Sequence, residues 1–190
     1  HSPSSLPALP AAPSGSLFLL MSKISGSAED AGTPAFRFVN LLRTFGVTHV
    51  VTVPDNTSAP IVEALMGSTP GVEGSGSSQE PVSLIFATRE GEAMGLASGL
   101  WIGGAHPVVM IQNTGLLEAG DGLRGTASRM GIPLLLIVTC RGFPKARRRG
   151  FDPAARIEDR DLLVRSDLDS VAFMTQATLD AWGIPYWLMT

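Results

Sequence analysis

The stretch that decides the fold is residues 82–97, which read VSLIFATREGEAMGLA. Its first five residues form an apolar run, which predicts a strand buried on both faces of a sheet. A helix is predicted to begin directly afterwards, with Glu90 in its first turn. Small side chains follow at Gly91, Ala93, Gly95, Ala97, Ser98 and Gly99. Something large is therefore expected to lie close to this helix, at the edge where an open α/β sheet presents its chemistry.

Glu90 has two interpretations at this stage. A carboxylate in the first turn of a helix gains from the free backbone N–H groups and from the positive end of the helix dipole, so Glu90 could be a simple N-terminal charge partner. The run of small residues after it favours a ligand-facing role instead. Glu92, two residues later, is expected to be a charge on the helix surface.

The rest of the chain alternates helix and strand. Apolar runs without clear polar alternation predict strands at residues 49–53, 82–86, 107–111, 133–139 and 185–189. Helices are predicted at residues 33–45, 58–66, 90–102, 116–129 and 170–182, the first opened by Thr33 as cap and by Pro34. This order predicts an α/β fold with a doubly wound, mainly parallel sheet and helices on both faces.

Composition defines the domain organisation. The 190 residues are 44% hydrophobic and 16% charged with a net charge of −3, which predicts one compact soluble domain and no overall nucleic-acid footprint. Residues 1–33 are rich in Pro, Ser, Gly and Ala, so we expect a disordered arm or leader there and a single domain over residues 34–190. Residues 17–21 are apolar but too few to span a membrane. Two longer connections, residues 67–80 and the basic residues 141–156, are expected to be mobile loops.

Several kinds of chemistry have little support. The single cysteine, Cys140, excludes an intrachain disulfide and fits a reducing, cytoplasmic compartment. At the end of an apolar strand, it is expected to be a buried small hydrophobe rather than a nucleophile. His1, His49 and His106 are isolated in the sequence, so neither a zinc site nor a Ser/His/Asp triad is predicted.

Polar loops follow four of the predicted strands, and parallel strands place their carboxyl ends on one rim of the sheet. The loops are Val53-Pro54-Asp55-Asn56, Thr88-Arg89-Glu90-Gly91, Gln112-Asn113-Thr114-Gly115 and Thr139-Cys140-Arg141-Gly142. Taken one at a time, each has a structural interpretation: Asp55 could form an Asx-turn or a cap, and Thr114 could cap a helix.

In order and spacing, however, the four loops resemble the pyrimidine-binding domain of thiamine-diphosphate-dependent 2-oxoacid decarboxylases of the phosphonopyruvate and sulfopyruvate decarboxylase type. The resemblance covers about residues 35–189. It implies that Glu90 contacts the cofactor's aminopyrimidine. There a protonated Glu90 promotes the imino tautomer of the 4-amino group, which removes the thiazolium C2 proton and starts the decarboxylation of a 2-oxoacid.

The same resemblance assigns the other loop residues. It implies that Gln112, Asn113, Thr114 and Gly115 lie beside the cofactor. Asp55 then faces the reacting carbon and serves in substrate positioning or proton handling, while Asn56 and Arg141 are implied to bind substrate. The run Lys145-Ala146-Arg147-Arg148-Arg149 departs from the family pattern. This run could bind an anionic group of the substrate, or it could be a solvated loop.

A separate partner chain is also implied. Gly120-Asp121-Gly122 matches the start of the superfamily's diphosphate and magnesium motif, but no asparagine follows it and no apolar strand precedes it. We interpret the triplet as a break or bend in a helix. A beta subunit carrying Gly-Asp-Gly and a later Asn is then expected to supply the Mg²⁺ ligands in an α₂β₂ heterotetramer or a multiple of it. The alternatives are a catalytically silent interaction or regulatory module and, with no Gly-x-Gly-x-x-Gly turn in support, a flavodoxin-like nucleotide binder.

Overall fold

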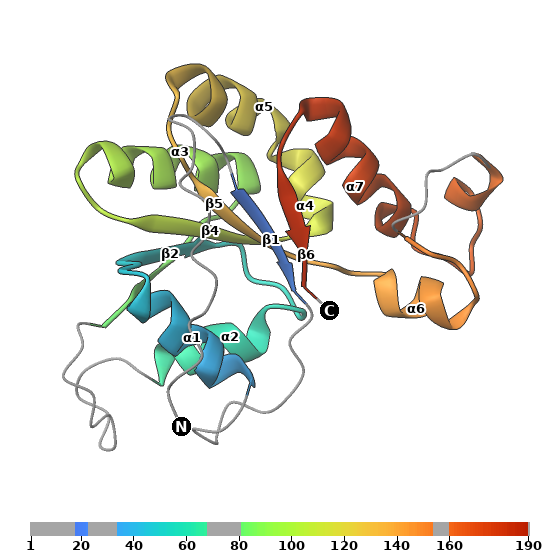
Figure 1. Ribbon diagram of the computed structural model, residues 1–190, viewed down its shortest axis with the longest axis horizontal. Coiled ribbons are helices and arrows are strands. Elements are labelled where there is room, and N and C mark those ends of the chain that lie inside the picture. Colours follow the sequence, from blue (N-terminus) through green and yellow to red (C-terminus); the bar gives the residue numbers. More distant parts are fainter. Residues whose placement is uncertain (1–17, 23–33, 68–80, 154–159, 190) are drawn as a thin grey trace, which may run out of the picture.

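The computed structural model describes residues 18–22, 34–67, 81–153 and 160–189. Its centre is a six-stranded parallel sheet in the order β3-β2-β4-β5-β1-β6 (Figure 1). The strands are β1 (Phe18–Ser22), β2 (His49–Thr52), β3 (Ser83–Phe86), β4 (Pro107–Gln112), β5 (Leu135–Thr139) and β6 (Tyr186–Leu188). The predicted α/β class, with a parallel sheet, is confirmed.

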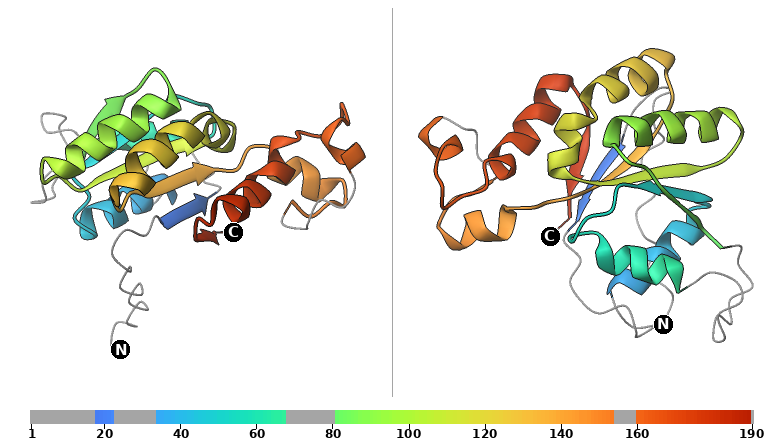
Figure 2. Two further views of the ribbon diagram at one scale, coloured as in Figure 1. Left: turned by 90° about the horizontal axis from the view of Figure 1, so that it is seen from above. Right: turned by 180° about the vertical axis from the view of Figure 1, so that it is seen from behind.

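Helices cover both faces of this sheet (Figures 1 and 2). α1 (Pro34–Thr44) and α2 (Ala59–Met66) pack on one face. The other face carries α3 (Glu90–Ile102), α4 (Asn113–Glu118), α5 (Gly120–Gly122), the π-helical turn η1 (Leu123–Ser128) and α7 (Val171–Trp182). α6 (Phe143–Arg148) and the 3₁₀ turn η2 (Arg160–Leu163) lie in the connection between β5 and α7.

The central strands are buried on both faces because their side chains alternate between the two helix layers. In β4, Val108 and Met110 pack with α1 and α2, whereas Val109 and Ile111 pack with the layer that contains α3. All four side chains are at most 2% exposed. β3 differs from the prediction: it lies at the edge of the sheet, and Phe86 at its end is 50% exposed. An apolar run does not distinguish a central strand from an edge strand.

The expectation for residues 1–33 is wrong for five of them. Phe18–Ser22 form β1, which pairs in parallel with β5 on one side and with β6 on the other. The sheet order therefore makes β1 the link between β6 and the other strands. Residues 1–17 and 23–33 lie outside the described residues. The run is too short to show a clear period, and Pro-rich and Ser-rich sequence surrounds it, so composition gave no strand signal.

Two further expectations need correction. Part of the basic segment predicted as a mobile loop is helical, because α6 begins at Phe143, which is buried together with Ala146. The predicted helix 116–129 is instead three short pieces: α4 begins three residues earlier at Asn113, and η1 is π-helical. Of the other predicted loop, residues 68–80 lie outside the part of the chain that the structure describes.

The Gly120-Asp121-Gly122 triplet forms α5, where its glycines serve close packing. A Cβ on Gly122 would lie 3.0 Å from the backbone oxygen of Gly91 at the start of α3. A Cβ on Gly120 would lie 2.9 Å from the ring of Trp182 in α7. The two glycines therefore let α5 pack closely against α3 and α7. None of the helices in the described ranges is long and apolar enough to cross a membrane.

Candidate functional site

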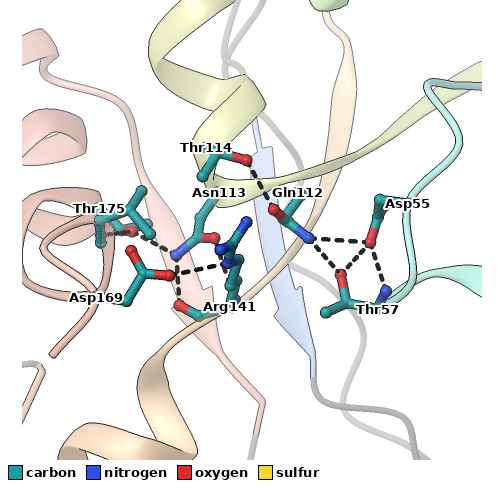
Figure 3. A network of polar contacts seen from close by, with 9 residues as sticks. Asp55, Thr57, Gln112, Asn113, Thr114, Arg141, Asp169 and Thr175 are labelled. Atoms are coloured by element: carbon teal, nitrogen blue, oxygen red, sulfur yellow. Dashed lines mark hydrogen bonds and ion pairs between the residues drawn. The ribbon is translucent and has the colours of Figure 1, made fainter. Parts of the chain in front are cut away.

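The carboxyl ends of β2, β3, β4 and β5 meet at one edge of the sheet. The register pairs Thr52 with Phe86 and Met110, and pairs Gln112 with Thr139. The loops that follow these strands therefore gather on one rim, as predicted. Hydrogen bonds join the loops after β2, β4 and β5 into a polar network (Figure 3). The loop after β3 joins α4 through a separate set of contacts, described below.

Glu90 is the first residue of α3, and its side chain lies against the backbone of Gly115 in α4. A Cβ built on Gly115 would lie 2.5 Å from Glu90 Cδ and would also overlap Oε1 and Cγ. The half-buried Glu90 carboxyl accepts no hydrogen bond from any other described residue. Only a glycine leaves room for this arrangement, so Gly115 acts as a seat for the Glu90 side chain.

Two other carboxylates hold the N-terminus of α3. Glu92 Oε2 accepts hydrogen bonds from the backbone N–H and the hydroxyl of Thr88, at 2.8 and 2.7 Å. Glu118 Oε2 accepts one from the backbone N–H of Gly91 at 2.7 Å, and its Oε1 accepts two from the guanidinium of Arg89, at 3.0 and 2.7 Å. Glu118 therefore binds an N–H of the first turn of α3, whereas Glu92 binds Thr88, which precedes the helix.

The same hydrogen bonds shift the acidity of these two groups. The side-chain and backbone donors of Thr88 lower the pKa of Glu92 below its ordinary value. The pKa of Glu118 is lowered by the Arg89 guanidinium and, to a smaller extent, by the Gly91 N–H. Both carboxylates are thus held in the ionised form at the start of α3.

Asp55 lies in the turn that leads from β2 into α2, and its carboxylate organises that turn. Oδ1 accepts the backbone N–H of Thr57 at 2.6 Å and that of Ser58 at 3.1 Å, as well as the Thr57 hydroxyl. Oδ2 accepts the Ser58 hydroxyl at 2.6 Å. The capping interpretation of Asp55 is therefore realised, while the neighbouring Asn56 is exposed on the rim.

Gln112 connects this turn to the loop after β4. Its Nε2 donates to Asp55 Oδ1 at 3.2 Å and to Thr57 Oγ1 at 3.3 Å, and its Oε1 accepts the Thr114 hydroxyl at 2.8 Å. Thr57 in turn contacts Thr139 at the end of β5, with 2.6 Å between their hydroxyl oxygens. The network fixes the three strand ends relative to one another, and the exposed Thr114 lies at its edge.

Asn113 is completely buried, and its side-chain amide is used within the protein. Its Nδ2 donates to the Arg141 carbonyl oxygen and to Thr175 Oγ1, both at 3.0 Å, and its Oδ1 accepts the Arg141 N–H at 3.1 Å. Buried amides require such partners. Asn113 therefore holds the loop after β5 against α7, and its place beside the cofactor, which the resemblance implies, stays a prediction.

Beyond this loop lies a polar hollow of about 600 Å³, with Arg141, Lys145, Arg165 and Asp169 in its wall. Arg141 Nε forms an ion pair with Asp169 at 2.9 Å. Gly142 turns the chain with φ +85°, and a Cβ on it would lie 2.9 Å from the Cβ of Asp169. Cys140 beside it is partly buried, and burial raises the pKa of its thiol to about 12, which disfavours the thiolate at neutral pH.

Sequence reasoning missed several members of this arrangement. Thr57 could have been found, because a hydroxyl two residues after an aspartate is typical of a capped turn. Glu118 and Asp169 gave no signal, since their partners lie 27 or more residues away in the sequence. Thr139 is in a predicted rim loop, but its contact with Thr57 could not be foreseen. Within the described ranges, no group of three or more His, Cys, Asp or Glu side chains is arranged to hold a metal ion.

Comparison with known proteins shows the family to which the chain belongs. Residues 33–159 match the family model described as "Thiamine pyrophosphate enzyme, N-terminal TPP binding domain". The match covers well over half of the chain, so the chain belongs to this family. The resemblance inferred from the rim loops is thereby confirmed.

Curated proteins that are similar to parts of this chain are decarboxylases or a decarboxylase subunit. The chain is 30% identical over 103 residues to phosphonopyruvate decarboxylase from Streptomyces viridochromogenes, an alignment that covers 54% of this chain and 23% of the relative. The same figures hold for phosphonopyruvate decarboxylase from Streptomyces hygroscopicus. Sulfopyruvate decarboxylase subunit alpha from Methanocaldococcus jannaschii is 34% identical over 58 residues, which cover 30% of this chain and 34% of that subunit. The chain thus spans only about a quarter to a third of these relatives.

The arrangement around Glu90 fits one part of thiamine diphosphate. A carboxyl group without a partner among the described residues suits a nitrogen heterocycle that offers both a donor and an acceptor. The aminopyrimidine of thiamine diphosphate is such a heterocycle.

Proposed function

We propose that this chain is the alpha subunit of a thiamine-diphosphate-dependent decarboxylase that acts on an anionic 2-oxoacid. The observation that carries the proposal is the position of Glu90. In a member of the N-terminal TPP binding family, this carboxyl is seated on Gly115 and accepts no hydrogen bond from any other described residue, while Glu118 binds an N–H of the first turn of α3.

Glu90 has a defined task in this proposal. When bound, thiamine diphosphate supplies the carbon that adds to the substrate's carbonyl and takes up the electron pair released as carbon dioxide leaves. Glu90 holds a proton at the pyrimidine ring nitrogen and so raises the basicity available at the neighbouring amino group. Because Gly115 has no side chain, it determines how closely the Glu90 carboxyl lies to α4. Gln112 and Thr114 present polar groups on the same rim, and the buried Asn113 amide holds the loop after β5.

We propose the class of substrate from the charged side chains on the rim. Lys145 is exposed in the wall of the hollow and forms no ion pair with any described residue, whereas Arg141 is paired with Asp169. A lysine in this position suits a sulfonate, phosphonate or second carboxylate. The named activities of the relatives involve such acids. We propose that Arg141 and Lys145, with Asn56 on the opposite side of the network, bind the anionic substrate, and that Asp55 positions it indirectly through its turn.

A second chain completes the proposed enzyme. The sulfopyruvate decarboxylase relative is named as a subunit alpha, which supports a separate beta subunit here. We propose that this partner carries Gly-Asp-Gly and a later Asn, holds the diphosphate through Mg²⁺, and forms an α₂β₂ heterotetramer or a multiple of it with this chain in the cytoplasm. The Gly120-Asp121-Gly122 triplet does not replace that motif, because both of its glycines are packed against neighbouring helices.

The test is a tagged pull-down of the full chain from its native cells, with mass spectrometry of the proteins that co-purify and a thiamine diphosphate assay on the eluate. We expect a partner bearing the diphosphate motif, bound cofactor, and release of carbon dioxide from sulfopyruvate or phosphonopyruvate. A chain that emerges alone and free of cofactor under gentle conditions contradicts the proposal and favours an interaction module. If the partner and the cofactor are present but neither acid is consumed, only the substrate assignment is wrong.

A further inference from the structure

The first turn of α3 attracts carboxylates, and Glu118 from α4 binds there. Helix N-termini leave backbone N–H groups without partners inside the helix. Glu118 Oε2 takes the N–H of Gly91 at 2.7 Å, while Oε1 takes two donors of the Arg89 guanidinium. The side chain of Glu118 is 32% exposed and that of Arg89 is 75% exposed, so the contact lies at the surface of the chain.

Without Glu118, these donors are free to attract the carboxylate of Glu90. Glu90 lies between Arg89 and Gly91 in the sequence, and a carboxylate gains from a free N–H and from a guanidinium alike. Glu90 is instead turned toward Gly115. Glu118 already satisfies the Gly91 N–H and pairs with Arg89. These two donors therefore do not draw the Glu90 carboxyl away from Gly115.

A single short helix carries both halves of this arrangement. Gly115 and Glu118 lie three residues apart in α4, so they share one face of that helix. Gly115 receives the Glu90 side chain, and Glu118 binds the backbone N–H of Gly91 and the guanidinium of Arg89, the residues on either side of Glu90. A movement of α4 relative to α3 therefore changes both contacts together.

We propose that Glu118 is a positioning residue: by occupying the N-terminus of α3 it keeps the Glu90 carboxyl on Gly115 and available for the cofactor. The catalytic consequence rests on the proposed function. The position of Glu90 itself does not, since it is a property of the chain alone. The local sequence around Glu118 indicates no role for it, because the residues that it binds lie 27 and 29 positions away.

The test compares Glu118→Ala with Glu92→Ala in the full chain. Glu92 is a matched control because its carboxylate also accepts two hydrogen bonds at the start of α3, at 2.7 and 2.8 Å, but from Thr88. The readout is the nuclear Overhauser contact between the Glu90 Hγ protons and the Gly115 Hα protons in labelled protein. We expect this contact to be lost in Glu118→Ala and kept in Glu92→Ala.

Retention of the contact at full intensity in a folded Glu118→Ala variant overturns the proposal. If that variant does not fold, Glu118→Gln serves in its place, because its amide oxygen still accepts the Gly91 N–H but no longer attracts Arg89. A weakened contact in Glu118→Gln supports the proposal, and an unchanged one overturns it.

A second measurement separates this proposal from the proposed function. In the complex with the partner chain, Glu118→Ala should lower kcat on the order of tenfold with little change in KM, since displacement of a catalytic group costs turnover more than binding. Glu92→Ala should leave kcat near the wild-type value. If the wild-type complex shows no decarboxylation while the Overhauser contact responds as expected, the proposed function fails and the positioning role of Glu118 stands.

Discussion

Glycine at position 115 and glutamate at position 90 depend on one another. The absence of a side chain at 115 is what allows the Glu90 carboxyl to lie against the start of α4, and any Cβ there would occupy the same space. Glu90 is only half-buried, so it has room to move outward. The site at this scale is therefore a matched pair of residues rather than a single catalytic group.

Gly115→Ala should consequently displace Glu90 without unfolding the chain. We expect turnover of the assembled enzyme to fall on the order of a hundredfold, because a displacement of about 1 Å is sufficient for such a loss. Gly125→Ala is the matched control, since a Cβ on Gly125 would meet no atom within 4 Å. Steady-state kinetics of the two variants make the comparison, with thermal melting to confirm that both fold. Equal activity would show that Glu90 does not need its present seat.

Cys140 offers a second prediction at the residue scale. Burial raises the pKa of its thiol to about 12, so the thiolate population near pH 8 is small. We expect a disulfide reagent to label the native chain on the order of a thousandfold more slowly than the chain in denaturant. The chain holds one cysteine, so the kinetics need no deconvolution. Similar rates in the two states would mean that the end of β5 opens freely.

Residues whose roles depend on local sequence could be predicted, and residues with distant partners could not. The position of Glu90 at the start of a helix follows from the strand and the small residues around it. The turn role of Asp55 was one of two options that sequence alone left open, and the hydrogen bonds to Thr57 and Ser58 realise it. Burial of the Asn113 amide depends on Arg141 and Thr175, which no local pattern connects to it.

Among the helices and strands, β1 gives a prediction about stability that a deletion can test. It pairs with both β5 and β6, and β6 pairs with no other described strand. Removal of residues 1–22 should therefore leave β6 without a partner and expose the edge of β5. We expect a lower melting temperature and faster amide hydrogen exchange at Tyr186–Leu188.

The control for that deletion is a chain that lacks residues 1–17 only and keeps the whole of β1. It should exchange at Tyr186–Leu188 at the rate of the full chain. If deletion through residue 22 leaves exchange and melting unchanged, the central position of β1 in the sheet is contradicted.

The helices and strands also show which features of the fold the hydrophobic pattern of the sequence predicts and which it does not. The bounds of α3 agree with the prediction, because small and apolar residues fill the helix after Glu92 and continue to Ile102. Pattern could not show that β3 lies at the sheet edge, since its position depends on which strands pair with it. It also could not show that the helix after β4 divides near Gly120 and Gly122, where close packing decides the geometry.

The whole molecule presents one half of a proposed active site. The chain belongs to the N-terminal TPP binding family, and the proposal assigns the pyrimidine-facing carboxyl to Glu90. The chain spans only 23% to 34% of its curated relatives, and diphosphate binding is assigned to a partner in the proposal. We therefore expect the isolated chain to show no decarboxylation with added thiamine diphosphate and Mg²⁺, and to gain it when the partner is added. Turnover by the purified chain alone would contradict the divided site.

The central claim is that Glu90 activates the cofactor, and the most direct measurement is the exchange of the thiazolium C2 proton of thiamine diphosphate with deuterium in the assembled enzyme. NMR of quenched samples should show rapid exchange in the wild type and in the Glu92→Gln control. In Glu90→Gln we expect exchange roughly a thousandfold slower, within the range typical of losing a positioned acid–base group. Exchange at the wild-type rate in Glu90→Gln would contradict the account.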